Sequence, residues 1–161
     1  MAVRKKSAKP PPVLACCRVL RYAVLSSSVR YSGHSNLYVD GRELGPVPSL
    51  AICQPLDRAE ILLCHCARDW TVLGAAAYAS IGEAKKRAEA IYPGVARAWV
   101  DARISKSQAT AYLNSVVWKG MKCTVCGKRP DEISRMLEKG KVRICDSCIR
   151  EFYRFLEEDD A

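Results

Sequence analysis

Four of the nine cysteines in this chain stand in two C-x-x-C pairs, a spacing that favours metal binding. The pairs are Cys123 with Cys126 and Cys145 with Cys148, and eighteen residues separate them. Each C-x-x-C turn directs two sulfur atoms at one point, so two turns complete a tetrahedron of thiolates about 2.3 Å from a zinc ion. Because four thiolates fill that coordination shell, we predict one structural zinc ion per chain and no catalytic position. Two other interpretations stay open: a redox-active dithiol pair, or four unrelated buried thiols.

Short elements around the two pairs must position these sulfur atoms. Gly127 follows the first pair, where a tight turn often requires a positive φ angle. A strand predicted over residues 141–144 leads into the second pair, and Asp146 is the predicted cap of a helix with an apolar stripe. We expect packing or interface residues on this helix at Phe152, Tyr153, Phe155 and Leu156, with Ile149 in the same stripe and Phe155 exposed beside it. The elements predict a treble-clef-like zinc finger over residues 121–158, which needs the metal to fold because so small a module has little core.

The same residues resemble the zinc-binding domain of ClpX, a bacterial protein-unfolding ATPase. The resemblance covers residues 121 to about 150 without a gap, at Cys123, Cys126, Gly127, Lys128, Glu132, Met136, Leu137, Val142, Ile144, Cys145, Asp146, Cys148 and Ile149. It implies a domain that dimerises and binds unfolded proteins or adaptor proteins through apolar residues outside its core. Val125 and Arg143 stand where that family usually has aromatic residues, and Gly140 stands one position later than the family's glycine. The chain has no G-x-x-x-x-G-K-[ST] phosphate loop, so the resemblance does not extend to the ATPase.

The residues before the zinc finger predict a separate domain over residues 13–104, whose family we do not recognise. Its predicted strands lie at 19–25, 29–31, 37–39, 50–53, 61–66, 70–73 and 99–100. The strand over 61–66 is almost wholly apolar and is expected at the centre of the sheet, and Asp40-Gly41 predicts a hairpin turn. A helix begins at Ser80, which forms a capping box with Glu83, and ends at Pro93-Gly94.

These patterns predict an α+β fold: a small antiparallel-sheet domain with one or two helices, followed by the C-terminal zinc finger. A linker helix is predicted over residues 105–120, with Ser107 in its first turn. Residues 1–12 are basic and proline-rich and are expected to be a disordered tail.

Two further groups of residues could carry chemistry in the first domain. Cys53, Cys64 and Cys66 could form a second metal site, but a strand over 61–66 directs His65 to the opposite face from its two neighbours. His34 lies in a polar turn and could pair with Cys53 or Cys64 as a nucleophilic couple, yet no motif marks the third, orienting group. We therefore expect buried thiols and a locally hydrogen-bonded histidine here.

Charge and composition limit the class of function. The net charge is +9, and residues 1–40 carry seven Lys and Arg against one Asp, so the positive charge is concentrated in the tail. A nucleic-acid-binding zinc protein that uses this tail is the alternative function, although such proteins usually carry a basic face on the folded reader. No apolar run approaches the length of a membrane span. We expect a cytoplasmic, non-enzymatic zinc protein whose partners are other proteins or a second copy of itself.

Overall fold

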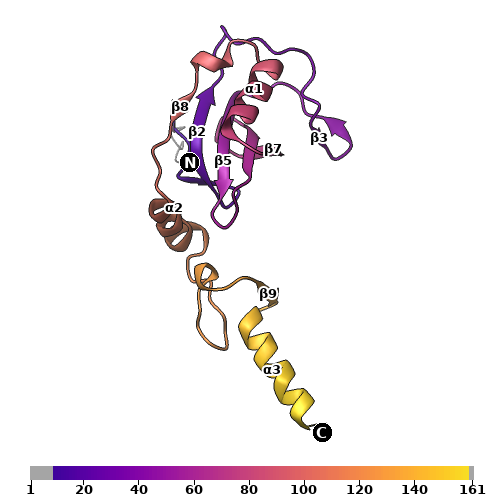
Figure 1. The fold of residues 1–161 in the computed structure, drawn as a ribbon, viewed down its shortest axis with the longest axis vertical. Helices are drawn as coiled ribbons and strands as arrows, with labels where there is room; N and C mark the ends of the chain where they lie inside the picture. Colours follow the sequence, from indigo (N-terminus) through magenta and orange to yellow (C-terminus); the bar gives the residue numbers. More distant parts are fainter. Residues whose placement is uncertain (1–8, 160–161) are drawn as a thin grey trace, which may run out of the picture. The chain divides into compact units, whose positions relative to one another are not determined.

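The computed structural model describes residues 9–159, and the chain divides between Ala109 and Thr110 into two compact units. The first unit carries a curved antiparallel sheet, a half-barrel, with helix α1 (Ile81–Ile91) on one face (Figure 1). The second carries the four cysteines of the two C-x-x-C pairs, a β-hairpin and helix α3 (Asp146–Asp159). The predicted α+β class is confirmed.

The sheet of the first unit has the strand order β1-β2-β5-β6-β7, and β8 also pairs with β2. The strands are β1 (Val13–Leu14), β2 (Cys17–Val24), β5 (Ser49–Pro55), β6 (Ile61–Cys66), β7 (Val72–Tyr78) and β8 (Val100–Asp101). Residues 1–8 of the predicted tail lie outside the described residues. Residues 9–12 of that tail are described, and the Pro12 carbonyl accepts a hydrogen bond from the Val19 N–H at 3.1 Å.

Alternating side chains bury both faces of the central strands, as the apolar run over 61–66 predicts. On one face Leu50, Ile52 and Leu63 pack against Ala84 and Ile91 of α1. On the other face a second core is formed by Leu14, Cys17, Val19, Tyr22, Ala51, Cys53, Cys64, Cys66 and Trp70. Helix α1 begins as predicted, because the Ser80 hydroxyl accepts a hydrogen bond from the Glu83 N–H. The central position of β6 between β5 and β7 is confirmed.

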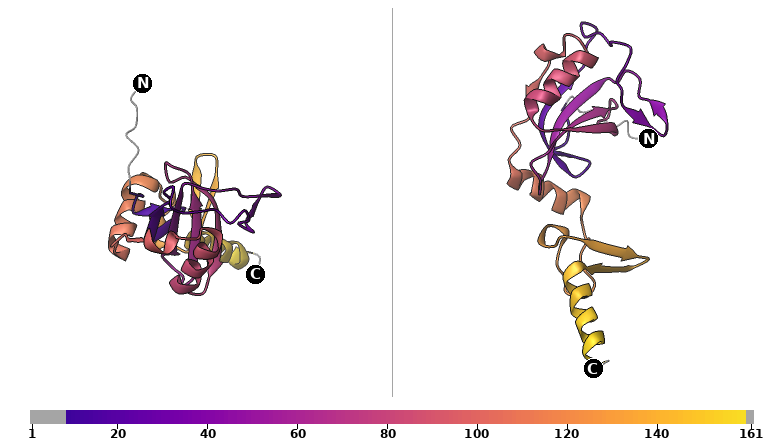
Figure 2. Two further views of the ribbon diagram at one scale, coloured as in Figure 1. Left: turned by 90° about the horizontal axis from the view of Figure 1, so that it is seen from above. Right: turned by 45° about the vertical axis from the view of Figure 1, so that its right-hand side comes forward.

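A small hairpin of β3 (Tyr38–Val39) and β4 (Arg42–Glu43) forms a two-stranded sheet of its own, and β3 lies near β7 of the main sheet (Figure 2). Its turn residues Asp40 and Gly41 both have positive φ angles, 51° and 76°, as a type I′ turn requires. The predicted hairpin is therefore confirmed.

Two strand predictions in the first unit are wrong. Val29 and Tyr31 lie in a loop. The N–H groups of Arg30 and Ser32 donate hydrogen bonds from this loop to carbonyls at the end of α1. The strand predicted over 70–73 is β7, which begins at Val72 and continues to Tyr78. Glycine and alanine have low strand propensity, and these residue types over 74–77 concealed the strand.

His65 of β6 is buried in the first unit, with 1% of its surface exposed. Its neighbours on that face are Tyr92, 6.0 Å away between ring centroids, and the charge of Arg87. Its Nδ1 has no hydrogen-bond partner among the described residues. Burial first, and then Arg87, lower the pKa of His65 to about 4. The imidazole is therefore neutral in the folded protein.

Acid should destabilise the first unit through this histidine. The unfolded state binds a proton with a pKa near 6.5, whereas the folded state binds it near 4, so stability is full above 6.5 and falls as the pH falls toward 4. We expect the free energy of unfolding to be about 2 kcal/mol lower at pH 5 than at pH 7. Urea titrations at both pH values test this, and His65→Phe should remove most of the difference. The exposed His34→Gln is the matched control and should preserve it.

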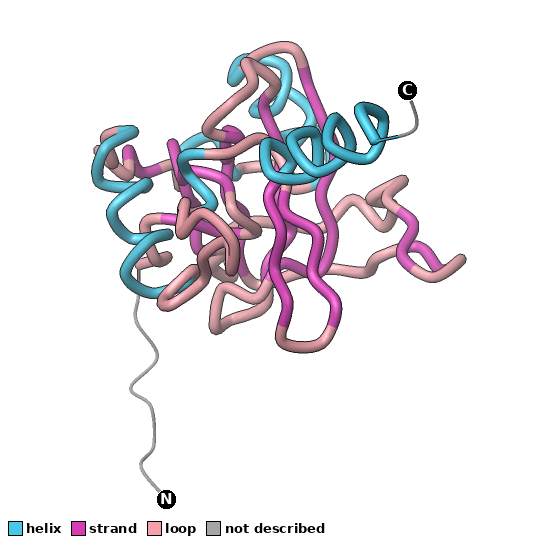
Figure 3. The backbone as a smooth tube through the Cα atoms, turned by 90° about the horizontal axis from the view of Figure 1, so that it is seen from below, coloured by secondary structure: helices cyan, strands magenta, loops and turns pink. Residues whose placement is uncertain are grey.

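The second unit begins within a helical segment that changes its hydrogen-bond pattern. Helix α2 (Lys106–Tyr112) continues directly into a π-helix, η2 (Leu113–Val117), and ends near the predicted position. A hairpin follows, formed by β9 (Met136–Lys139) and β10 (Val142–Cys145), and α3 starts at the next residue (Figure 3). The predicted strand over 141–144 corresponds to β10, whereas its partner β9 was missed.

The short helices η1 (Val95–Arg97) and η3 (Pro130–Glu132) complete the elements of the described chain. Within residues 9–159, every helix is too short or too polar to span the hydrocarbon layer of a membrane.

Candidate metal centre

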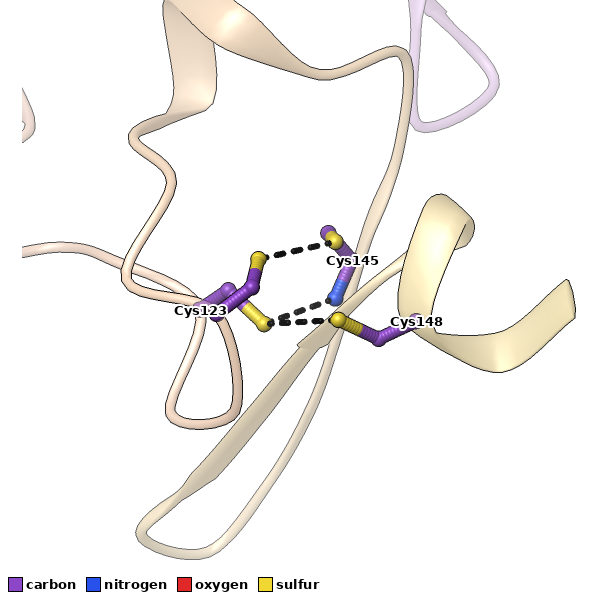
Figure 4. Close-up of side chains that lie close together, drawn as sticks. Cys123, Cys145 and Cys148 are labelled. Carbon is purple, nitrogen blue, oxygen red and sulfur yellow. Dashed lines mark hydrogen bonds between the residues drawn. The ribbon is translucent and has the colours of Figure 1, made fainter. Parts of the chain in front are cut away.

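The four predicted ligands come together in the second unit. The sulfur atoms of Cys123, Cys126, Cys145 and Cys148 all lie within 4.8 Å of one another. The Cys123 and Cys148 sulfurs are 3.8 Å apart, and the Cys126 and Cys145 sulfurs are 3.6 Å apart (Figure 4). A tetrahedron with metal–sulfur bonds of about 2.3 Å has edges of about 3.8 Å. The cluster therefore has the dimensions of a site for one metal ion with four thiolate ligands.

The first cysteine pair lies on a tight turn tied to the hairpin. The Gly127 N–H donates to the Cys123 carbonyl at 2.9 Å, and Gly127 has the expected positive φ of 76°. Thr124, between the two cysteines, donates from its N–H and its hydroxyl to the Arg143 carbonyl, at 2.7 and 2.8 Å. These bonds hold the turn against β10, which ends at Cys145.

The second cysteine pair lies where β10 passes into α3. Asp146 was predicted to cap this helix, but it is the first helical residue, and its carboxylate accepts a hydrogen bond from the Arg135 N–H at 3.3 Å. The same carboxylate pairs with Arg150, one turn further along α3. Asp146 therefore joins the start of α3 to the segment before β9, and its position is set by the hairpin as well as by the helix.

Backbone hydrogen bonds shape the charge of the cluster. Donation from the backbone of Cys126, helped by that of Cys145 and Val125, lowers the pKa of Cys123 to about 6 in spite of its burial. The backbone of Cys148 likewise lowers the pKa of Cys145, whereas burial raises the pKa of Cys148. Cys126 is the exposed member of the set, and the other three are buried. Aligned backbone donors toward thiolates are the environment in which a bound cation replaces the thiol protons.

The donor set fits zinc. Four thiolates at tetrahedral spacing are typical of structural Zn²⁺ sites, although iron also binds such sets. No family model, curated protein or solved structure matches this chain. The metal site is therefore identified by the spacing of the four sulfur atoms alone.

The structure does not bring the second predicted group of cysteines into a metal cluster. Among the described residues, the four cysteines of the second unit form the one group of three or more potential ligands with suitable spacing. Cys53, Cys64 and Cys66 lie together on the second core face, and His65 lies on the α1 face, as strand alternation predicts. Cys53 and Cys64 share a hydrogen bond, and this bond and burial raise the pKa of Cys53. These thiols belong to the core of the first unit.

His34 pairs with a carboxylate of its own loop region and not with Cys53 or Cys64. Its ring Nδ1 is 3.3 Å from the Glu43 carboxylate, and its side chain is 77% exposed. Glu43 also accepts the Asn36 N–H, which places His34 in the loop before β3. Cys53 and Cys64 are buried in the second core. The expectation of a locally hydrogen-bonded histidine is met.

Large apolar side chains cover the outside of the second unit. Its buried cluster consists of Cys123, Cys145 and Cys148, against which Ile133 and Ile144 pack. The large apolar residues of this unit that are exposed are Val116, Val117, Val125, Leu137, Val142, Ile149, Phe152, Tyr153, Phe155 and Leu156. Phe155 was expected to be exposed, and 59% of its surface is. Leu156, which belongs to the apolar stripe of α3, is 67% exposed. The stripe of α3 is thus largely exposed in the described part of the unit, most of all toward Leu156.

Proposed function

We propose that this chain is a cytoplasmic, non-enzymatic zinc protein whose second unit binds proteins, both a second copy of itself and unfolded chains or adaptor proteins. The observation that carries the proposal is that the large apolar side chains of this unit lie mostly on its surface and not in its core. Cysteines form its core, while three aromatic side chains and several aliphatic ones point outward. An exposed apolar surface of this kind marks a protein-interaction site.

The metal in this proposal is one zinc ion with a structural role. The four thiolates of Cys123, Cys126, Cys145 and Cys148 fill a tetrahedral shell, so no coordination position remains for a substrate or water. None of the nine cysteines forms a disulfide, which supports a reducing compartment such as the cytoplasm. Zinc therefore supplies folding free energy to the unit, and the exposed side chains supply the binding.

The resemblance to the ClpX zinc-binding domain supports the same function. That family pairs a four-cysteine zinc site with apolar residues that dimerise and bind unfolded proteins or adaptors. None of the three departures from the family, at Val125, Gly140 and Arg143, is a metal ligand. The Val125 side chain is half-exposed, and Arg143 forms an ion pair with Glu138 across the hairpin at 3.1 Å. The zinc site can thus be kept while the partner specificity differs.

Self-association of the second unit tests the proposal. We expect a fragment of residues 110–161 with bound zinc to dimerise in light scattering, and to bind a reduced, carboxymethylated protein with little dependence on salt. Replacing Phe152 and Leu156 by serine should weaken both by at least about tenfold, because interface aromatic residues contribute most of the binding energy. Replacing Ser147 by alanine, in the first turn of the same helix, is the matched control.

Two results would count against the proposal. One is a zinc-loaded fragment that is monomeric and binds no unfolded protein. The other is binding to a polyanion that falls steeply as salt is added, which would favour the nucleic-acid alternative instead.

A further inference from the structure

Strand β7 forms a free edge of the main sheet. Among the described residues it pairs with β6 alone, and no backbone hydrogen bond from another segment reaches it within residues 9–159. In an antiparallel sheet, alternate residues of such a strand direct their N–H and C=O groups away from the sheet. Seven residues, Val72–Tyr78, therefore present a row of backbone donors and acceptors.

The sequence of this edge lacks the residues that usually protect one, although Leu37 and Val39 pack on one face of the strand beside Gly74. The strand's sequence, V-L-G-A-A-A-Y, contains no charged residue and no proline. The opposite side of the sheet differs, since β1 has two residues and β8 carries Asp101, which pairs with Arg21 at 2.8 Å. Long, uncharged and unpaired edges template the addition of another strand. The side of β1 and β8 therefore offers little backbone for pairing, whereas the β7 edge is suited to it.

We propose that β7 pairs antiparallel with β7 of a second copy of this chain, about a two-fold axis beside Ala75. The middle of the strand, Gly74 to Ala77, consists of small residues, and the bulkier Val72 and Tyr78 stand at its ends. Two such strands can approach closely with small residues facing small residues. The absence of charge means that no like charges oppose each other across the axis.

The register follows from the space around Gly74. A side-chain carbon added at Gly74 would lie 2.9 Å from Leu37 Cδ2 and 3.1 Å from Val39 Cγ2, so these side chains fill that face. A residue opposite Gly74 on the partner must therefore be small. Centring the pair on Ala75 places Ala76 of the partner opposite Gly74, whereas centring it on Ala76 would place Tyr78 there. Ala75 and Ala77 are exposed on the other face, where the partner's residues have room.

This interface is independent of the one proposed for the second unit. It uses backbone groups of the first unit and makes no use of zinc or of α3. The two are separated by testing the full chain with Phe152 and Leu156 replaced by serine. We expect this background protein to remain a dimer in light scattering, with slowed hydrogen exchange over 72–78.

A charge swap at the axis tests both the pairing and its register. Ala75→Lys places the Cβ atoms of two lysines about 5 Å apart across the axis, so two like charges oppose each other there. The substitution should raise the dimer dissociation constant by at least about tenfold. Ala75→Glu should do the same. An equimolar mixture of the two variants should form a heterodimer, because opposite charges then face each other. The matched control, Val24→Lys at the exposed last residue of β2, should stay dimeric.

Each other outcome overturns the inference. A monomeric background protein with fast exchange over 72–78 removes the interface. An Ala75→Lys variant that dimerises as well as its parent removes the proposed axis. Two monomeric variants that stay monomeric when mixed remove the register, and circular dichroism establishes whether each has folded.

Discussion

Replacing Cys145 by serine should unfold the second unit and abolish stoichiometric zinc binding. Cys145 is fully buried, its sulfur lies 3.6 Å from that of Cys126, and its N–H donates to the Cys123 sulfur at 3.4 Å. Structural zinc contributes about 10–16 kcal/mol to the folding of comparable modules. The buried cluster of this unit consists of metal ligands, so little else compensates for the loss of one.

Zinc content and the amide resonances of α3 are measured in the parent chain and in Cys145→Ser. The parent chain should contain one zinc ion per chain by elemental analysis, and two per chain would revive a site at Cys53, Cys64 and Cys66. In the variant, the amide resonances of α3 should collapse to unfolded positions while those of the main sheet remain. Cys16→Ser, at an exposed thiol outside the cluster, should leave both readouts unchanged. A Cys145→Ser protein with a native α3 would contradict metal-dependent folding.

Leu63→Ala should destabilise the first unit by about 2–5 kcal/mol, through lost burial and the cavity left behind. Leu63 is fully buried on the α1 face of β6, where it pairs with Ile52 and Ala76 on the neighbouring strands. The melting temperature of this unit should fall by at least about 8 °C. Differential scanning calorimetry gives this value.

The control for Leu63 is Val24→Ala, on the same sheet but half-exposed, which should change stability by less than about 1 kcal/mol. Zinc content should be the same in both variants, since neither residue belongs to the second unit. A change in melting temperature within error for Leu63→Ala would contradict its place in the core.

Local chemical signals explain which elements the sequence predicts. Asp40-Gly41 marks a hairpin because both positions need positive φ, and Ser80 marks a helix start because its hydroxyl accepts an early N–H. The four ligands were predicted for the same reason, since the C-x-x-C turn is a local device. β7 was mostly missed because Gly74 to Ala77 carry no strand signal of their own and become a strand by pairing with β6.

Other features depend on contacts between distant residues. β9 contains Glu138 and Lys139, which do not resemble a strand, and its pairing with β10 depends on their register. Asp146 was predicted to cap α3, but it is the first residue of the helix. Its carboxylate accepts a hydrogen bond from the Arg135 N–H, just before β9. Tyr31 looks like a strand residue, but hydrogen bonds from its neighbours Arg30 and Ser32 to the end of α1 leave it in a loop. In each case long-range pairing overrides local propensity.

The sulfur-built core of the second unit has an evolutionary consequence. Cys148 lies in the first turn of α3, so coordination determines where this helix starts without help from the side chains further along it. Mutations at Tyr153, Phe155 or Leu156, whose side chains are 59–67% exposed, should then carry a small folding penalty. The sequence of that surface can therefore change while the four-cysteine scaffold beneath it stays the same.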